Sequence, residues 1–191
     1  MISGEGLKPT GPTTNDLQGT ALTAQKNIDN LQYIQTLYEP EFLTYLGQGK
    51  AWTGDILNKI NPANRNDFST RAANFEQQTL QFFNEYRKWV TGVAAGEKEM
   101  MWLQDSIPSM GDSPQAFEAK IQTMIQRQHI VDVRAQAALR AGITPNGEGW
   151  EEFAKANPLD SIPTAQERGE QLEKLGYTTD QVVQMLRQEG Y

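Results

Sequence analysis

The sequence predicts an all-α protein, an elongated bundle of coiled-coil-like helices followed by a small C-terminal helical hairpin. Three long segments repeat apolar residues at alternating four- and three-residue steps, the spacing of one helix face in a left-handed bundle. No segment shows the convincing period-two alternation of a half-buried strand. Two capping boxes near the end of the chain each predict a short helix.

The chain of 191 residues divides into four predicted segments. Residues 1–13 are rich in Gly, Pro and Thr, and they predict a flexible arm. Residues 14–141 hold the long apolar stripes and predict the bundle. Residues 142–163 are interrupted by Pro and Gly, which predicts a linker with a short helix around Trp150–Ala156. Residues 164–191 predict the hairpin.

The first predicted helix ends before Pro40, because proline interrupts a helix. Its stripe consists of Leu17, Ala21, Ala24, Ile28, Leu31, Gln35 and Tyr38.

A second helical run extends from Phe42 to Ile60, although three glycines weaken it. Glycine lets two backbones approach closely. The run around Trp52 is therefore interpreted as a tight subunit contact or, equally well, as a locally bent helix.

The third run carries an aromatic stripe that ends near Thr91-Gly92. It consists of Phe68, Ala72, Phe75, Thr79, Phe82, Tyr86 and Trp89. Such a stripe can line a ligand channel, but its helical period favours the core of the bundle. A short acidic helix is expected next, over residues 96–107.

The segment Asp112-Ser113-Pro114 raises the question of catalysis, because Gly-Asp-Ser is a nucleophile signature of one class of serine esterases. A serine nucleophile needs a base, and His129 is the only histidine. Both residues lie on one predicted helix, about 24 Å apart at 1.5 Å per residue. Proline in the first helical turn after Ser or Asp is typical of a helix start. We therefore expect a helix cap, no catalytic residue and no enzyme.

The helix that starts here repeats the four-three spacing and is expected to stop near Gly142. Its stripe consists of Phe117, Ile121, Met124, Gln128, Val131, Ala135 and Ala138.

Composition argues against several other functions. The net charge is −7, and Lys and Arg are scattered among acids, so free nucleic acid is not an expected ligand. There is no cysteine, and one histidine is too few for a zinc site, so neither a metal nor another cofactor is expected. No stretch approaches the roughly 20 apolar residues of a membrane span, and the first residues do not resemble a signal peptide.

The end of the chain predicts a surface for partners. Residues 142–191 hold nine acidic and four basic side chains, an excess that a basic partner surface would complement. Amides on the long helices suit wet contacts between subunits or an ordinary solvated surface. The residues predicted for a partner or oligomer interface are Trp52, Leu172, Leu175, Tyr177, Val182, Leu186 and Tyr191.

The segment Phe75–Met124 resembles a recurrent helical module of tailed bacteriophages. In such chains an aromatic helix ends in a segment like Val90-Thr91-Gly92-Val93-Ala94-Ala95, followed by an acidic helix, a proline and an Asp-Ser-Pro helix start. The upstream helix fits as well, so the resemblance covers roughly residues 15–141. The relatives are described as internal virion, DNA-transfer or ejection proteins.

The resemblance implies a non-enzymatic virion protein that oligomerises at a portal, tail or internal core and assists genome delivery. Its partners would be copies of itself and other virion proteins. It would be assembled in the cytoplasm of the bacterial host and then located in the virion. The alternative is an adaptor, or a capsid- or connector-associated module, that docks a partner through its acidic C-terminal hairpin. A hydrolase is a third, minor interpretation.

Overall fold

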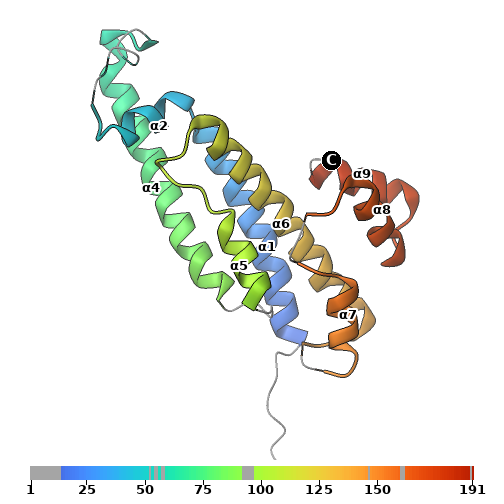
Figure 1. Cartoon of the computed structure of the whole chain (residues 1–191). Helices are drawn as coiled ribbons and strands as arrows, with labels where there is room; N and C mark the ends of the chain where they lie inside the picture. The colour runs from blue at the N-terminus through green and yellow to red at the C-terminus, as the bar shows by residue number, and fades with distance from the viewer. Residues whose placement is uncertain are drawn as a thin grey trace, which may run out of the picture.

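The computed structural model describes residues 14–51, 53, 56, 59–91, 97–145, 147–159, 162–189 and 191. In this part of the chain the regular secondary structure is all helical, as predicted, with eight α-helices, one short 3-10 helix and no strand. The predicted arm and Trp52 lie outside the described residues. Figure 1 shows an elongated body of long helices with the C-terminal helices at its side.

Three long helices make the body: α1 (Thr14–Leu37), α4 (Arg65–Val90) and α6 (Pro114–Ala141). α1 and α6 are antiparallel and lie closest together, while α4 runs in the same direction as α6 (Figure 1). The short helix α5 (Glu97–Asp105) packs on α4 and buries Leu103 there. The 3-10 helix η1 (Pro62–Asn64) leads directly into α4.

The second predicted helical run is shorter than its apolar residues suggest. Helix α2 (Pro40–Gly47) begins with proline in its first turn and buries Phe42 and Leu43. It ends because Gly49 and Lys50 both adopt positive φ, at 68° and 65°, a conformation that the helix interior excludes. The predicted run to Ile60 therefore does not form one continuous helix, and Gly54 lies outside the described residues.

The aromatic stripe of α4 is the core of the bundle, as predicted. Phe75 is fully buried, and its ring centre lies 5.7 Å from those of Tyr38, Phe42 and Phe117. Those rings come from the end of α1, from α2 and from α6, so four segments meet at one residue. Offset and edge-to-face ring pairs at this spacing add stability beyond the burial of apolar area.

A chain of uncharged hydrogen bonds crosses the same core. The Asn27 amide donates to the Gln128 carbonyl oxygen at 3.0 Å, and the Gln128 amide donates to the Tyr86 hydroxyl oxygen at 3.1 Å. The Tyr86 hydroxyl in turn donates to the backbone carbonyl oxygen of Leu103 at 3.3 Å. The chain joins α1, α6, α4 and α5, and it satisfies polar groups that would otherwise be costly to bury.

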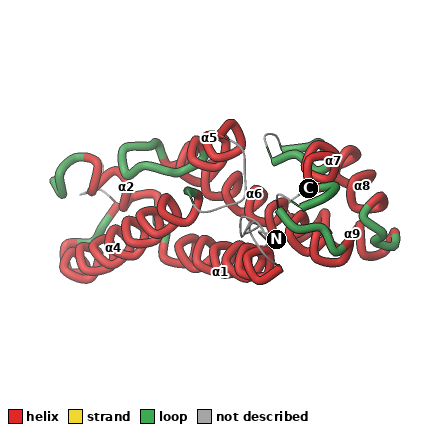
Figure 2. Tube along the Cα trace, turned by 90° about the horizontal axis from the view of Figure 1, so that it is seen from below, coloured by secondary structure: helices red, strands yellow, loops and turns green. Residues whose placement is uncertain are grey.

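The C-terminal segment forms three short helices: α7 (Trp150–Ala156), α8 (Ala165–Lys174) and α9 (Thr179–Glu189). Figure 2 shows them gathered on one side of the body. α8 and α9 contact each other as the predicted hairpin, and both predicted capping boxes form, Thr164 with Glu167 and Thr178 with Gln181. The division into separately folding units stays a prediction.

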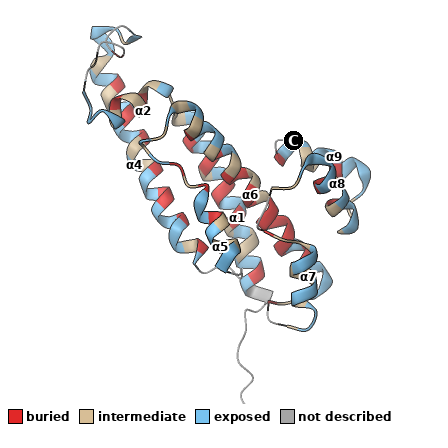
Figure 3. Ribbon diagram, in the orientation of Figure 1, coloured by how far each residue is buried: buried red, intermediate tan, exposed pale blue. Residues whose placement is uncertain are grey.

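The second half of α6 is the most enclosed part of the described chain. α1 covers one side, α7 packs near its end, and the hairpin contacts it through α9. The buried colour in Figure 3 therefore extends around much of this helix. Gly142, at a φ of 68°, ends α6 as predicted, and the amide of Ile143 donates back to the Ala138 carbonyl oxygen.

Candidate interaction site

The Gly-Asp-Ser segment is a helix start, as predicted. Ser113 is the N-cap of α6, and its hydroxyl oxygen accepts a hydrogen bond from the backbone amide of Ala116 at 3.2 Å. Asp112 forms a salt bridge with Lys120 at 2.9 Å and accepts from the Ser109 amide. The serine oxygen and the neighbouring carboxylate are both occupied by local structure.

His129 lies far from Ser113, on the part of α6 that faces the hairpin. Burial lowers its pKa, while Glu189 and Asp132 oppose that shift and Arg168 adds to it. Its Nε2 is buried and has no hydrogen-bond partner. The geometry does not pair this imidazole with a nucleophile.

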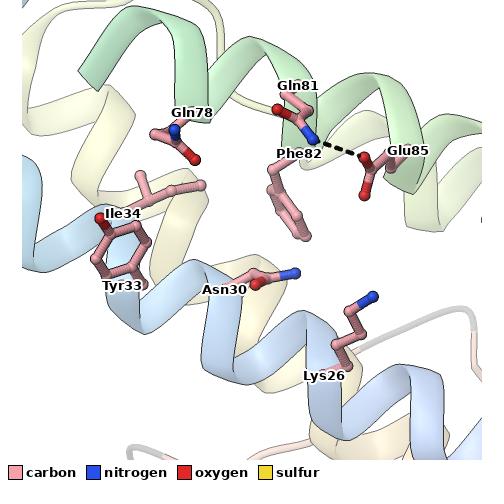
Figure 4. Close-up of a pocket in the computed structure, with 8 residues that line it drawn as sticks. All are labelled: Lys26, Asn30, Tyr33, Ile34, Gln78, Gln81, Phe82 and Glu85. Carbon is pink, nitrogen blue, oxygen red and sulfur yellow. Dashed lines mark hydrogen bonds between the residues drawn. The ribbon is translucent and has the colours of Figure 1, made fainter. Parts of the chain in front are cut away.

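An open groove with a volume of about 290 Å³ lies between α1 and α4 (Figure 4). Its apolar base consists of Ile34 and Phe82, which are 2% and 6% exposed. The walls carry polar side chains from both helices, namely Lys26, Asn30, Tyr33, Gln78, Gln81 and Glu85.

The groove exists because α1 lies close to α6 and less close to α4. Across the resulting gap the facing side chains include the amides of Asn30, Gln78 and Gln81. Figure 4 shows Phe82 pointing from α4 into the gap, with Asn30 and Lys26 opposite on α1. The Gln81 amide donates to the Glu85 carboxylate at 3.1 Å along the rim.

The described lining side chains have the chemistry of a protein contact and form no nucleophile–base pair. Amides donate and accept hydrogen bonds, and Ile34 and the Phe82 ring offer apolar contact. Tyr33 is 51% exposed at one end, and Leu22 is 74% exposed farther along α1. Leu22, Lys26 and Tyr33 share one helix face, because they follow steps of four and seven residues. The groove therefore continues into an exposed strip on α1.

The predicted interface residues of the hairpin lie mostly against the protein's own α6. Leu172 and Val182 are 0% and 5% exposed, and they cluster with Val133 of α6. Leu175, Tyr177 and Leu186 pack at the edge of this cluster. Tyr191 is half-buried. Their burial has an intramolecular cause, and their role toward a partner stays a prediction.

The sequence pattern did not predict the buried ion pair that links α8 to α9 within the hairpin. Arg168 donates to both oxygens of Glu189, from Nε at 2.7 Å and from Nη2 at 2.8 Å. Both residues are at most 3% exposed. A buried bidentate ion pair has a specific geometry. Removal of one partner strongly destabilises the fold, because the other charge stays buried without compensation.

Two arginines on α6 stack on tryptophan rings of neighbouring helices, Arg127 on Trp102 of α5 and Arg134 on Trp150 of α7. Arg127 lies 4.2 Å from the centre of the Trp102 ring, and burial lowers its pKa. Arg134 forms a salt bridge with Glu99 at 2.8 Å, and Glu99 also accepts from the Leu159 amide. These contacts attach α5 and the segment after α7 to α6, which is a structural role.

Among the described residues, no three His, Asp or Glu side chains lie together as ligands for a metal ion. No helix in the described ranges is long and apolar enough to cross a bilayer. Comparisons with protein-family models, curated proteins and solved structures found no match. The α1–α4 groove is thus proposed as an interaction site on its geometry alone.

Proposed function

We propose that this chain is a non-enzymatic structural protein that assembles with copies of itself in a tailed-bacteriophage virion. It would act at the portal, the tail or an internal core, and it would assist genome delivery. The virion role is supported by the resemblance of Phe75–Met124 to phage helical modules. The protein would be assembled in the bacterial cytoplasm and then incorporated into the particle.

The observation that carries the assembly role is the α1–α4 groove. Its base is apolar, its walls carry three amides together with Lys26 and Glu85, and an exposed tyrosine lies at one end. Interfaces combine an apolar centre with a polar rim and are enriched in tyrosine, and this groove has that composition. Coiled-coil-like contacts between long helices of neighbouring copies are the packing we propose for it.

The charges near the groove favour a second copy over a strongly charged partner. α1 presents Lys26 and Asp29, and α4 presents Glu85 and Lys88, all exposed. This mixture of signs can pair with itself when the same surface meets a second copy. It would not attract nucleic acid, which requires clustered cations.

Light scattering coupled to size-exclusion chromatography tests the assembly role. We expect the wild-type chain to form oligomers whose fraction grows with concentration. Tyr33→Asp places a charge at the groove and should shift the population toward monomer. Gln32→Asp, exposed on the same helix outside the groove lining, is the matched control and should leave the oligomer intact. A wild-type chain that stays strictly monomeric at high concentration contradicts the proposal.

The second candidate function is an adaptor that docks a basic partner through the acidic C-terminal hairpin. The observation in its favour is that Glu170, Glu173 and Asp180 are exposed on the hairpin. Removal of residues 164–191 separates the two functions. Loss of partner capture with unchanged oligomers would favour the adaptor, whereas loss of the oligomer itself would not.

A further inference from the structure

The α8–α9 hairpin makes most of its polar contacts within itself. The Arg168–Glu189 pair links the start of α8 to the end of α9, and each helix has its own capping box. Gly176, at a φ of 87°, closes α8, where the Tyr177 amide donates to the Leu172 carbonyl oxygen at 3.2 Å. All these contacts persist if the hairpin moves away from α6 as a unit.

The contact between the hairpin and α6 is small and incompletely satisfied. Its buried apolar centre consists of Val133, Leu172 and Val182. Two buried polar atoms, Nε2 of His129 and the Tyr191 hydroxyl oxygen, have no hydrogen-bond partner. Both residues lie within electrostatic range of the Arg168–Glu189 pair. Burial of the His129 nitrogen without a partner costs free energy, so this docking is weaker than its apolar contacts alone imply.

The space between the hairpin and the body is also incompletely filled. A crevice of about 510 Å³ lies between α6, α7 and α8, lined by apolar side chains that include Ala137, Phe153 and Leu175. At its rim Arg140 donates to the Tyr177 hydroxyl oxygen at 2.8 Å and stacks on the ring. The bundle core contrasts with this, because it packs ring against ring.

The hairpin is joined to the body by a short connection. Trp150 and Phe153 of α7 pack beside Leu17 and Ala138, which fixes α7 to the bundle. Leu159 is 2% exposed, and its amide donates to Glu99 at 3.2 Å. The cap of α8, Thr164, follows Leu159 by only five positions in the sequence. Short connections of this kind favour exchange of the attached element between chains.

We propose that the α8–α9 hairpin exchanges between copies of this protein, so that the hairpin of one copy docks on α6 of another. The apolar cluster around Val133 then forms between chains with the same residues as within one chain. Exchange therefore costs little in contact energy and creates a symmetric, reciprocal link. The inference does not depend on the α1–α4 groove, and it adds a second means of self-association.

Cross-linking between two single-cysteine variants tests the exchange, since the chain contains no cysteine. Purified full-length Val133→Cys and Val182→Cys proteins, carrying different tags, are mixed at equal concentration and oxidised. Exchange places Cys at 133 of one copy beside Cys at 182 of the other, which yields a disulfide-linked heterodimer. A mixture of Gln32→Cys with Val182→Cys gives the yield of random collision, because Gln32 is exposed and lies outside the groove lining. We expect the first mixture to exceed it about tenfold or more, because docking raises the effective thiol concentration.

A low heterodimer yield would contradict the proposed exchange. A heterodimer yield at the Gln32→Cys level overturns the proposal, provided that the double variant Val133→Cys/Val182→Cys closes its disulfide within one chain. Circular dichroism checks that each variant is folded. A Gly-Ser-Gly-Ser insertion after Pro163 lengthens the connection and should lower the heterodimer yield several-fold. Tyr33→Asp in both chains should leave the yield unchanged, which separates failure of exchange from failure of the groove.

Discussion

The bundle and the C-terminal hairpin are both helical, but they are stabilised in different ways. In the bundle, rings from four segments meet around Phe75, and the side chains of Asn27, Gln128 and Tyr86 form an uncharged hydrogen-bond chain. In the hairpin, a single charged pair links the two helices, and three buried aliphatic residues form the contact with α6. A crevice remains between the hairpin, α6 and α7, and Nε2 of His129 on α6 has no hydrogen-bond partner.

This difference indicates which helix contacts of the chain are easiest to break. Many ring contacts must be lost together before α1, α4 and α6 separate. The hairpin can leave with its internal contacts intact, so its opening costs only the docking energy. Elements with few buried apolar contacts are the ones that open locally in folded proteins.

The largest expected effect lies in the bundle. Phe75→Ala removes a ring that touches three others, and it should lower the free energy of unfolding by about 3–5 kcal/mol. Urea denaturation followed by circular dichroism measures the loss. Leu22→Ala, at an exposed site on α1, is the control and should stay within about 0.5 kcal/mol of wild type. A loss for Phe75→Ala as small as the control would break the comparison.

The second effect should be confined to the hairpin. Arg168→Met leaves the Glu189 carboxylate buried without its partner, which costs about 3–5 kcal/mol where the charge stays buried. Hydrogen exchange should then accelerate in α8 and α9 and stay slow in α1 and α4. The double variant Arg168→Met/Glu189→Leu replaces both charges and should restore protection. Accelerated exchange throughout the bundle would show that the two regions form one cooperative unit.

A smaller effect is expected at the start of α6. Ser113→Ala removes the N-cap bond to the Ala116 amide and should cost about 1 kcal/mol. Thermal unfolding measures it, with Gln115→Ala as an exposed control in the same turn. If a preparation shows ester hydrolysis, the rate should be the same in this variant. Loss of hydrolysis without loss of folding would return Ser113 to consideration as a nucleophile.

The smallest effect is a weakening of hairpin docking in acid. Burial lowers the pKa of His129, so the detached state, with a pKa near the ordinary value of about 6.5, binds the proton first. Docking thus loses stability as the pH falls through about 6.5, until the docked histidine is also protonated. Arg168, Glu189 and Asp132 are the charged groups that face His129. Burial raises the pKa of Asp132, so its protonation partly restores docking at lower pH.

Hydrogen exchange of the hairpin amides at about pH 7.5 and about pH 5.5, on either side of the ordinary histidine pKa, measures this loss. The intrinsic exchange rate is corrected for pH. His129→Gln cannot titrate, and its hairpin should show equal protection at both values. An acid-dependent opening that persists in His129→Gln would assign the effect to another group.

The sequence predicted the helices well, because local spacing and capping determine them. Every stripe residue of α6 is buried, and α7 spans the predicted residues Trp150–Ala156. The stripe of α1 drifted, since Ile34 is buried where the spacing predicted Gln35, which is exposed. A straight helix of 3.6 residues per turn drifts in this way against a 3.5-residue repeat.

The α1–α4 groove could not be predicted, because it depends on distances between helices rather than on residues along one of them. The groove requires the separation of α1 and α4 to exceed the separation of α1 and α6. No local sequence pattern predicts that difference. The Arg168–Glu189 pair spans 21 residues and two helices, so neither helix alone reveals it. The sequence pattern placed Leu172 and Val182 on the apolar faces of the hairpin helices. In the structure these residues pack on Val133 of α6 in the same chain.

The hydrogen-bond chain from Asn27 through Gln128 to Tyr86 has a consequence for how the helices align. Sliding α1 along α6 by one turn would separate Asn27 from Gln128 and leave buried amides without partners. No carboxylate or ammonium group takes part in the chain, and burial raises the pKa of the Tyr86 hydroxyl, which keeps it protonated in alkali. The same axial alignment of the three long helices should therefore persist in dilute buffer and in concentrated salt. This rigid element would then keep its alignment when the ionic strength changes.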